Sequence, residues 1–230
     1  MPQTPRLLEL FSGTGSVGRS FREKGWEVVS VDLDPKSGAN LITDVGTWYF
    51  QAAHPPGFFD CVWASPPCTH YSSARTTAKT PRDLEGSDRL VQKALDIAAY
   101  HKPKGGHFIE NPQSGLLKGR AVVQALSFVD TSYCKYDYPY RKTTRIWTDN
   151  THFKPNNACS RNEPCYVMAE PGHHTMTAQR GPGKHKGSPI SGDCCSLNQL
   201  HSMPKKLCDQ IAEAATHALE THDEESFLSE

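Results

Sequence analysis

The chain has 230 residues and equal numbers of acidic and basic side chains, so its formal net charge is zero. A chain of this length can bury one good hydrophobic core. It contains no run of about 18 apolar residues, so we expect no membrane span and no membrane partner. Residues 1–5 lack the shape of a signal peptide. We therefore expect an intracellular protein whose eight cysteines are reduced or metal-bound rather than paired in disulfides.

A glycine-rich turn near the N-terminus joins the first predicted elements. An apolar strand over 6–11 precedes the turn, a helix over 16–24 follows it, and a second strand over 26–31 leads to Asp32. Glycines let the backbone approach a ligand, and an acid after the second strand can accept hydrogen bonds from ribose hydroxyls. This order predicts an α/β fold with a nucleotide-like ligand, although a dinucleotide site or a turn without a ligand gives the same glycine spacing.

A cysteine follows the next predicted strand, which covers residues 58–64. The loop is Ser65-Pro66-Pro67-Cys68, and its prolines stop the strand because they cannot donate to a β-ladder. Ligands bind at the carboxyl ends of strands in open α/β sheets. The position favours Cys68 as a nucleophile, with a structural thiol as the alternative.

A carboxylate ends a further predicted strand over 106–112. Glu110 is followed by Asn111 and Pro112, and it is expected at the same edge of the sheet as Cys68. A solvated acid or a helix cap is the alternative interpretation of Glu110.

In chain order, these blocks resemble the motifs of the DNA cytosine-C5 methyltransferase family. The proline after the Glu-Asn pair is similar to that of small phage or viral members, because larger members commonly have Val there. The matching residues are 11–15, Asp32, Asp44, 66–68, 110–111 and 141–147, and the likeness covers most of residues 5–150. The resemblance implies an α/β, Rossmann-type S-adenosylmethionine-dependent methyltransferase sheet with a small irregular target-recognition insertion.

The resemblance also implies covalent chemistry on cytosine. A thiolate that adds to C6 activates C5 to accept a methyl group. Cys68 is the expected nucleophile, Glu110 the residue that contacts the N3/N4 edge, and Arg145 the residue that holds O2. The target base must leave the stack to reach Cys68. We expect double-stranded DNA as the partner of a monomeric enzyme, in the cytoplasm or nucleoid or in a virus-infected host cell.

S-adenosylmethionine is the cofactor that the resemblance implies. Asp32 is expected to bind the ribose hydroxyls, and Asp44 the adenine amino group. The full set of expected cofactor-binding residues is Phe11, Gly13, Thr14, Gly15, Ser16, Asp32, Leu33, Asp44, Ser65 and Pro66.

Three other functions remain open at this point. Adenine-N6 methyltransferases share the two prolines but normally have Asp or Asn before them and an aromatic residue after them, where this chain has Ser65 and Cys68. A related branch of the family acts on RNA. A catalytically inactive nucleic-acid-binding module is the third alternative, and the presence of Cys68, Glu110 and Arg145 argues against it.

The charge distribution suggests where nucleic acid could bind. Lys and Arg outnumber Asp and Glu between residues 135 and 190, whereas the chain after residue 208 has acids but neither Lys nor Arg. An evenly mixed surface with a solvated acidic tail is the alternative. The expected DNA-binding residues are Ser72, Arg75, Arg141, Lys142, Arg180 and Lys184.

The predicted organisation is a catalytic core over 1–150, a short target-recognition region over 151–199, a C-terminal helix over 200–220 and a disordered tail over 221–230.

The region 151–199 is rich in Pro, Gly, His and Cys and lacks periodicity. Such a region often needs a metal to fold. Zinc held by Cys159, Cys165, one of His173 and His174, and Cys194 or Cys195 is one hypothesis, and scattered reduced cysteines are the other. Of these, the set we expect is Cys159, Cys165, His173 and Cys194.

Overall fold

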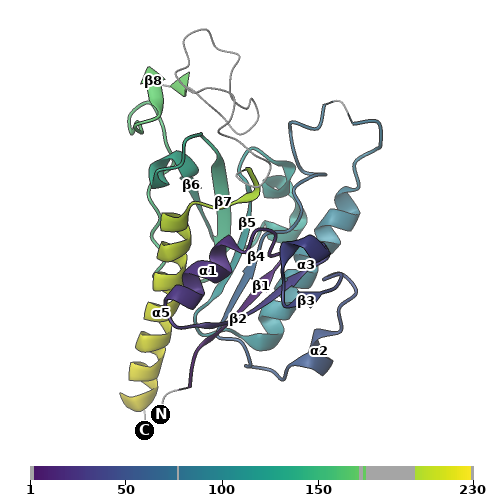
Figure 1. The fold of residues 1–230 in the computed structure, drawn as a ribbon, viewed down its shortest axis with the longest axis vertical. Coiled ribbons are helices and arrows are strands. Elements are labelled where there is room, and N and C mark those ends of the chain that lie inside the picture. Colours follow the sequence, from purple (N-terminus) through teal and green to yellow (C-terminus); the bar gives the residue numbers. More distant parts are fainter. Residues whose placement is uncertain (1–2, 77, 171–172, 175–199, 229–230) are drawn as a thin grey trace.

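The computed structural model describes residues 3–76, 78–170, 173–174 and 200–228 (Figure 1). Its centre is a seven-stranded sheet in the order β3-β2-β1-β4-β5-β7-β6. Strands β1 to β5 are parallel, whereas β7 is antiparallel to both β5 and β6. The strands are β1 (Arg6–Leu10), β2 (Glu27–Asp32), β3 (Leu41–Ile42), β4 (Cys61–Ala64), β5 (His107–Pro112), β6 (Phe128–Ser132) and β7 (Thr143–Thr148). This is the predicted α/β, Rossmann-type fold.

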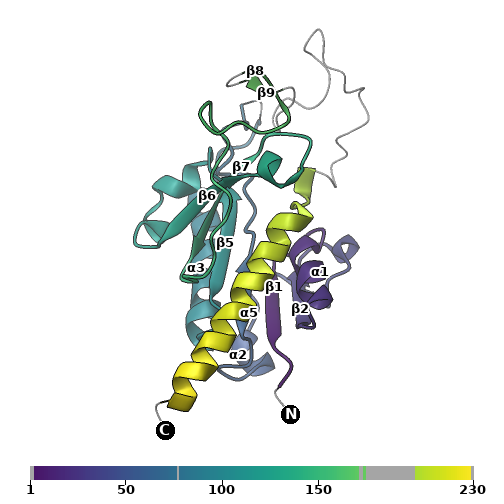
Figure 2. The same ribbon diagram turned by 90° about the vertical axis from the view of Figure 1, so that its left-hand side faces the viewer.

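Helices cover both faces of the sheet (Figures 1 and 2). Helices α1 (Ser16–Glu23) and α5 (Lys205–Leu228) pack together on one face, and α3 (Leu84–His101) covers the other. Successive side chains of a strand point to opposite faces, so Leu7 joins the core with α1 and α5 while Leu8 joins the core with α3. The shorter helical elements are α2 (Phe50–Ala53), η1 (Pro35–Ser37), η2 (Leu116–Gly119), η3 (Ala121–Val123) and η4 (Tyr133–Tyr136).

The glycine turn allows α1 to lie close against the sheet. Gly15 precedes the helix with a φ of 64°, which is a left-handed conformation that glycine adopts without strain. A Cβ atom at Gly18 would lie 2.4 Å from Oε2 of Glu9 and 3.1 Å from Cγ1 of Val28. The bare backbone of Gly18 instead donates to Oε1 of Glu9 at 3.0 Å. The turn thereby places the start of α1 beside the carboxyl end of β1.

The C-terminal helix is longer than the sequence predicted. The expected disordered tail over 221–230 is wrong for residues up to Leu228, because α5 continues to that residue. Beyond the buried Ala215 of this helix, the hydroxyl of Thr221 lies 3.4 Å from Nε2 of His152, and the ring centres of His152 and His217 are 4.4 Å apart. These contacts with the segment after β7 support the helix beyond Ala215.

The region 151–199, which the sequence predicts to recognise the target, is described only in part. After β7 an irregular segment leads to a small hairpin of β8 (Met168–Glu170) and β9 (His173–His174). Residues 171–172 and 175–199 lie outside the described part of the chain. Among the helices of the described ranges, none combines the length and apolarity that crossing a membrane requires.

Candidate active site

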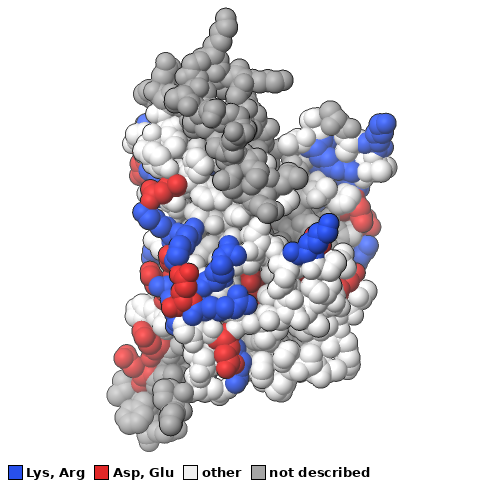
Figure 3. Space-filling view, in the orientation of Figure 1, with Lys and Arg blue, Asp and Glu red and all other residues white. Residues whose placement is uncertain are grey.

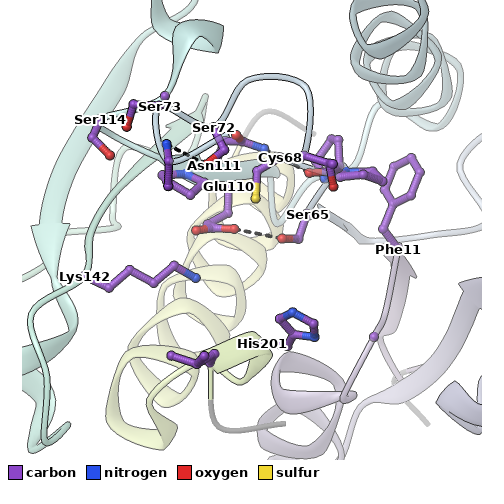
Figure 4. A pocket seen from close by; sticks show the side chains of 18 of the residues that line it. Phe11, Ser65, Cys68, Ser72, Ser73, Glu110, Asn111, Ser114, Lys142 and His201 are labelled. Atoms are coloured by element: carbon purple, nitrogen blue, oxygen red, sulfur yellow. Dashed lines mark hydrogen bonds between the residues drawn. The ribbon is translucent and has the colours of Figure 1, made fainter. Parts of the chain in front are cut away.

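A cavity of about 650 Å³ opens at the carboxyl ends of β1, β4 and β5 (Figure 4). Strands β1 and β4 are neighbours at the point where the strand order reverses, which is where ligands bind in open α/β sheets. The volume is in the range of small-molecule and cofactor pockets. Phe11, Gly13, Asp32 and Leu33 line it from the ends of β1 and β2. Ser65, Pro66, Cys68, Glu110 and Lys142 line it from β4, β5 and β7 or the loops beside them.

Cys68 is held on a fixed loop after β4. The amide Nδ2 of Asn111 donates to the carbonyl oxygen of Pro66 at 2.9 Å. The carbonyl oxygen of Cys68 accepts from the backbone N–H groups of Tyr71 at 3.0 Å and Ser72 at 2.8 Å. The thiol lies in the cavity close to Glu110 (Figure 4). The expected stop of the strand at the two prolines thus leaves the thiol facing a ligand site.

The buried Tyr71 anchors the segment that follows Cys68. Its hydroxyl donates to Oδ1 of Asp88 at 2.8 Å, and Asp88 in turn accepts from Nε of Arg120 at 2.9 Å and Nη2 at 2.7 Å. Further along, Nδ1 of His70 accepts from the backbone N–H of Asp83 at 2.8 Å, which closes the base of the loop 69–83. The loop therefore starts and ends at fixed points beside the cavity.

Glu110 is buried at the end of β5 with 3% of its surface exposed. The hydroxyl of Ser65 donates to its Oε2 at 2.8 Å, and the hydroxyl of Thr144 on β7 donates to its Oε1. These two donors orient the carboxyl group at the cavity wall beside Cys68 (Figure 4). Sequence reasoning missed Thr144, because nothing in the sequence shows that β7 pairs with β5.

The charges of Glu110 and Lys142 shift the pKa of the Cys68 thiol in opposite directions. Burial raises the pKa of the Cys68 thiol, and the negative charge of Glu110 raises it further, whereas the positive charge of Lys142 lowers it. Lys142 lines the cavity, and its Nζ donates to the hydroxyl of Tyr133 at 3.2 Å. Lys142 is therefore positioned to favour the reactive thiolate.

Arg145, which the resemblance implies holds the base, is not among the residues that line the cavity. Strand β7 alternates its side chains between faces, so Arg145 points away from the face on which Thr144 meets Glu110. Its Nε and Nη2 atoms donate to Asp130 at 2.7 and 2.8 Å, and its guanidinium lies 3.6 Å from the ring centre of Phe128. The cation from this motif that lines the cavity is Lys142.

The ends of β1 and β2 form the part of the cavity that suits a nucleoside. The carboxylate of Asp32 accepts from the backbone N–H of Gly13 and of Asp34, each at 2.8 Å, and retains lone pairs for further hydroxyls. Phe11 and the 68% exposed Leu33 line the same cavity with apolar surface. Asp32, Phe11, Gly13 and Leu33 thus lie where the sequence predicts a cofactor.

Four of the expected cofactor residues lie outside the lining of this cavity: Thr14, Gly15, Ser16 and Asp44. The hydroxyls of Thr14 and Ser16 lie 2.8 Å apart, and Ser16 also accepts from the backbone N–H of Met203 at 3.3 Å. The carboxylate of Asp44 is exposed and accepts from the N–H of Gly46 at 2.8 Å. These residues support the turns around the cavity.

Leu200 and His201 line the cavity although sequence reasoning did not single them out. They precede α5, and the side chain of His201 lies across the cavity from Lys142 and Glu110 (Figure 4). They reach the site because α5 docks against α1, which is a tertiary contact that no local sequence signal marks.

The expected DNA-binding residues have different surroundings. Ser72 lines the cavity, while Arg75 donates to the carbonyl oxygen of Thr80 at 2.8 Å and to its hydroxyl at 2.6 Å within the loop 69–83. Arg141 is exposed beside Lys142. The loop 69–83 projects from the molecule (Figure 1), and Figure 3 shows Lys and Arg near its tip. Over the face that carries α1 and α5, Lys and Arg are mixed with Asp and Glu (Figure 3). Arg180 and Lys184 lie outside the described residues.

Two of the expected metal ligands come together with partners that differ from those predicted. Cys159 and Cys165 form a cluster with Cys134 and His174. The histidine of the cluster is His174, whereas the expected set has His173, and Cys194 lies outside the described residues. Cys134 was not predicted, because the fold brings it from a distant part of the sequence. The six cysteines of the described ranges are free thiols.

Comparison with known proteins shows the family to which this chain belongs. No family model matches the chain. A protein of Frog virus 3 (isolate Goorha), named as a probable DNA (cytosine-5)-methyltransferase, is 38% identical over 175 residues, which are 71% of this chain and 78% of the viral protein. In fold, the chain resembles the Entamoeba histolytica methyltransferase EhMeth, with a TM-score of 0.51 and 11% identity over 95% of this chain and 99% of that one. The likeness to the viral protein shows that this chain belongs to the DNA (cytosine-5)-methyltransferase family, whose enzymes depend on S-adenosylmethionine.

Proposed function

We propose that this protein transfers a methyl group from S-adenosylmethionine to carbon 5 of a cytosine in DNA through a covalent bond between Cys68 and carbon 6. The observation that carries the proposal is the shared cavity, in which Cys68 and Glu110 line one part and Asp32 another. The partner we propose is double-stranded DNA, and the active species is a monomer.

The residues around Asp32 fit S-adenosylmethionine. The Asp32 carboxylate is a hydrogen-bond acceptor for ribose hydroxyls, and Phe11 and Leu33 supply apolar surface for the rest of the nucleoside. When bound, the cofactor supplies an electrophilic methyl group. The chain contributes the orientation of that group toward the base and the exclusion of water from the cavity.

Cys68 and Glu110 have complementary roles in the reaction: Cys68 attacks the ring, and Glu110 stabilises the charge that the attack produces. The Cys68 thiolate attacks carbon 6 and forms a carbon–sulfur bond, and the electron pair of the ring moves toward N3 and carbon 5. Glu110 lies beside Cys68 and is oriented by Ser65 and Thr144, so it can hydrogen-bond the N3/N4 edge and stabilise the ring as its charge changes. After methylation a base removes the proton at carbon 5, and Cys68 leaves as the ring regains its double bond.

The loop 69–83 is the proposed contact for the DNA strand that carries the flipped base. It starts directly after Cys68, projects from the sheet, and carries Arg75, Lys79 and Arg82 (Figures 1 and 3). Cations on such a loop favour the phosphate backbone. A base outside its stack reaches Cys68 at a cost of roughly a few kcal/mol.

The test is the transfer of labelled methyl groups to unmethylated duplex DNA, followed by analysis of the nucleosides. We expect label in 5-methylcytosine with the natural protein and none with Cys68→Ala, while both proteins bind S-adenosylmethionine. Cys61→Ala is a matched control because that buried thiol lies on β4 outside the cavity lining. Duplex DNA with 5-fluorocytosine at the target should trap a covalent complex, because fluorine cannot leave as a proton does.

Each result has a defined meaning. Label in RNA but not in DNA would assign the same chemistry to a different substrate. Methylation by Cys68→Ala at the natural rate would exclude the covalent mechanism. Label in N6-methyladenine would exclude cytosine as the target.

A further inference from the structure

Four ligand-type side chains from three separate segments meet beside β6 and β7. Cys134 belongs to η4, Cys159 and Cys165 lie on the irregular segment after β7, and His174 belongs to β9. Their ligand atoms all lie within 4.8 Å of one another. The Nε2 atom of His174 is 3.6 Å from Sγ of Cys134, 3.3 Å from Sγ of Cys159 and 3.2 Å from Sγ of Cys165. One imidazole nitrogen thus faces three thiols.

This arrangement has the dimensions of a tetrahedral zinc site. With zinc–sulfur bonds of about 2.3 Å and zinc–nitrogen bonds of about 2.0 Å, tetrahedral angles separate sulfur from nitrogen by about 3.5 Å. The three observed separations lie close to that value. Thiolate and imidazole ligands favour zinc over magnesium or calcium, which prefer oxygen. We propose that Cys134, Cys159, Cys165 and His174 bind one zinc ion per chain.

Four protein ligands make this a closed, structural site rather than a catalytic one. Cys134 and Cys159 are buried, and Cys165 and His174 are partly buried. Three thiolates with a neutral imidazole leave the zinc centre with one net negative charge. Nζ of Lys135 donates to the carbonyl oxygen of Pro164 at 3.2 Å, which places a cation at the residue before Cys165.

The surrounding segment explains why a metal is needed there. From the end of β7 to the start of the hairpin, the described chain contains neither a helix nor a strand, and the hairpin strands are short. A segment with so little buried apolar surface cannot offset its conformational entropy by packing alone. Zinc binding supplies that stabilisation and ties the segment to η4, which is part of the core.

The zinc site is linked to the wall of the active-site cavity by two short chains of hydrogen bonds. The N–H of Cys159 donates to the hydroxyl of Ser132 at 3.1 Å, and that hydroxyl lies 3.1 Å from the hydroxyl of Thr143, which lines the cavity. Next to Cys134, the N–H of Tyr133 donates to the carbonyl oxygen of Lys142 at 2.9 Å. Bound zinc therefore fixes the segment after β7 against Thr143 and Lys142 at the cavity wall. The zinc inference does not depend on the proposed reaction.

The experiment measures metal directly in the full chain, purified without chelators and freed of any histidine tag. We expect one zinc per chain by elemental analysis. Replacement by cobalt should give the visible absorption of tetrahedral cobalt together with thiolate-to-cobalt charge transfer in the near ultraviolet. Cys134→Ser, Cys165→Ser and His174→Ala should each lose at least tenfold in zinc occupancy. Cys208→Ala is a control that should keep the metal, because it removes a buried thiol that lies outside the cluster.

The wild-type cobalt spectrum keeps the test decisive even if a variant fails to fold. A folded wild-type protein with neither zinc nor a cobalt spectrum would overturn the site. So would loss of zinc from Cys194→Ser but not from Cys134→Ser, since that result would restore a ligand set with Cys194. A disulfide between any two of the three cluster cysteines in metal-free protein isolated under reducing conditions would also overturn it.

Discussion

The hydroxyl of Thr144 on β7 donates a hydrogen bond to Oε1 of Glu110 on β5. The two strands are antiparallel neighbours, so β7 reaches the same edge of the sheet as the loop that carries Cys68. Together with Ser65, Thr144 leaves the Glu110 carboxyl group little freedom to rotate. The more deeply buried acid of the cavity is thus positioned by Ser65, which the sequence predicts as a site residue, and by Thr144, for which the sequence predicts no role.

Replacing Thr144 by Val should impair the chemical step. Val keeps the shape of the side chain but removes the donor, and a hydrogen bond to a charged group contributes about 1.5–3 kcal/mol. We expect kcat to fall by roughly 10- to 100-fold, with little change in the affinity for S-adenosylmethionine. Steady-state kinetics with isothermal titration of the cofactor measures both. Thr144→Ser is the matched control, and an equal loss in that variant would mean that packing rather than the donor matters.

The pH dependence of the Cys68 thiol should respond to Lys142 and Glu110 in opposite directions. Lys142 lowers the pKa of the thiol and Glu110 raises it, so Lys142→Met should shift the thiol titration to higher pH and Glu110→Gln to lower pH. Alkylation rates of Cys68 measured against pH follow the thiolate directly. Lys142→Arg should keep the natural profile. Identical profiles for Lys142→Met and the natural protein would show that Lys142 does not influence the titration of the Cys68 thiol.

Arg145 should prove to be a structural residue. Its guanidinium is committed to Asp130 and Phe128 on the face of β7 away from the cavity. Arg145→Met should lower stability by about 1 kcal/mol, which is roughly 2–4 °C in Tm for a chain of this size, and leave kcat within about threefold. Thermal unfolding and kinetics on the same preparation separate the effects. A large fall in kcat with an unchanged Tm would instead support a direct contact with the base.

Glu9 should make the stability of the fold depend on pH. Burial, the largest influence, raises its pKa from 4.5 to about 7, although the N–H of Gly18 partly opposes this. Between these values the native state keeps a proton that the unfolded chain releases, so stability should fall as pH rises through this window. Each pKa unit corresponds to about 1.4 kcal/mol, so the free energy of unfolding should be lower by roughly 3 kcal/mol at pH 8 than below pH 4. Denaturant unfolding at several pH values should show this slope in the natural protein and a flatter one in Glu9→Gln.

The elements with local signals could be predicted from the sequence. The glycine turn between 12 and 18, the acid at Asp32, the proline stop before Cys68 and the acid at Glu110 depend on backbone sterics and strand ends, and they lie at the predicted edge of the sheet. Parallel strands necessarily bring their carboxyl ends together, so this part of the site followed from the order of strands alone.

After residue 112, tertiary packing determines which side chains face the cavity and which contact one another. Strand alternation makes a side chain face one side of the sheet or the other, and pairing with β5 and β6 fixed that choice for Thr144 and Arg145. Docking of α5 on α1 brought His201 to the cavity, and the turn after β6 brought Cys134 to Cys159. Contacts between residues far apart in the chain depend on packing across the whole sheet, which no local pattern of residues contains.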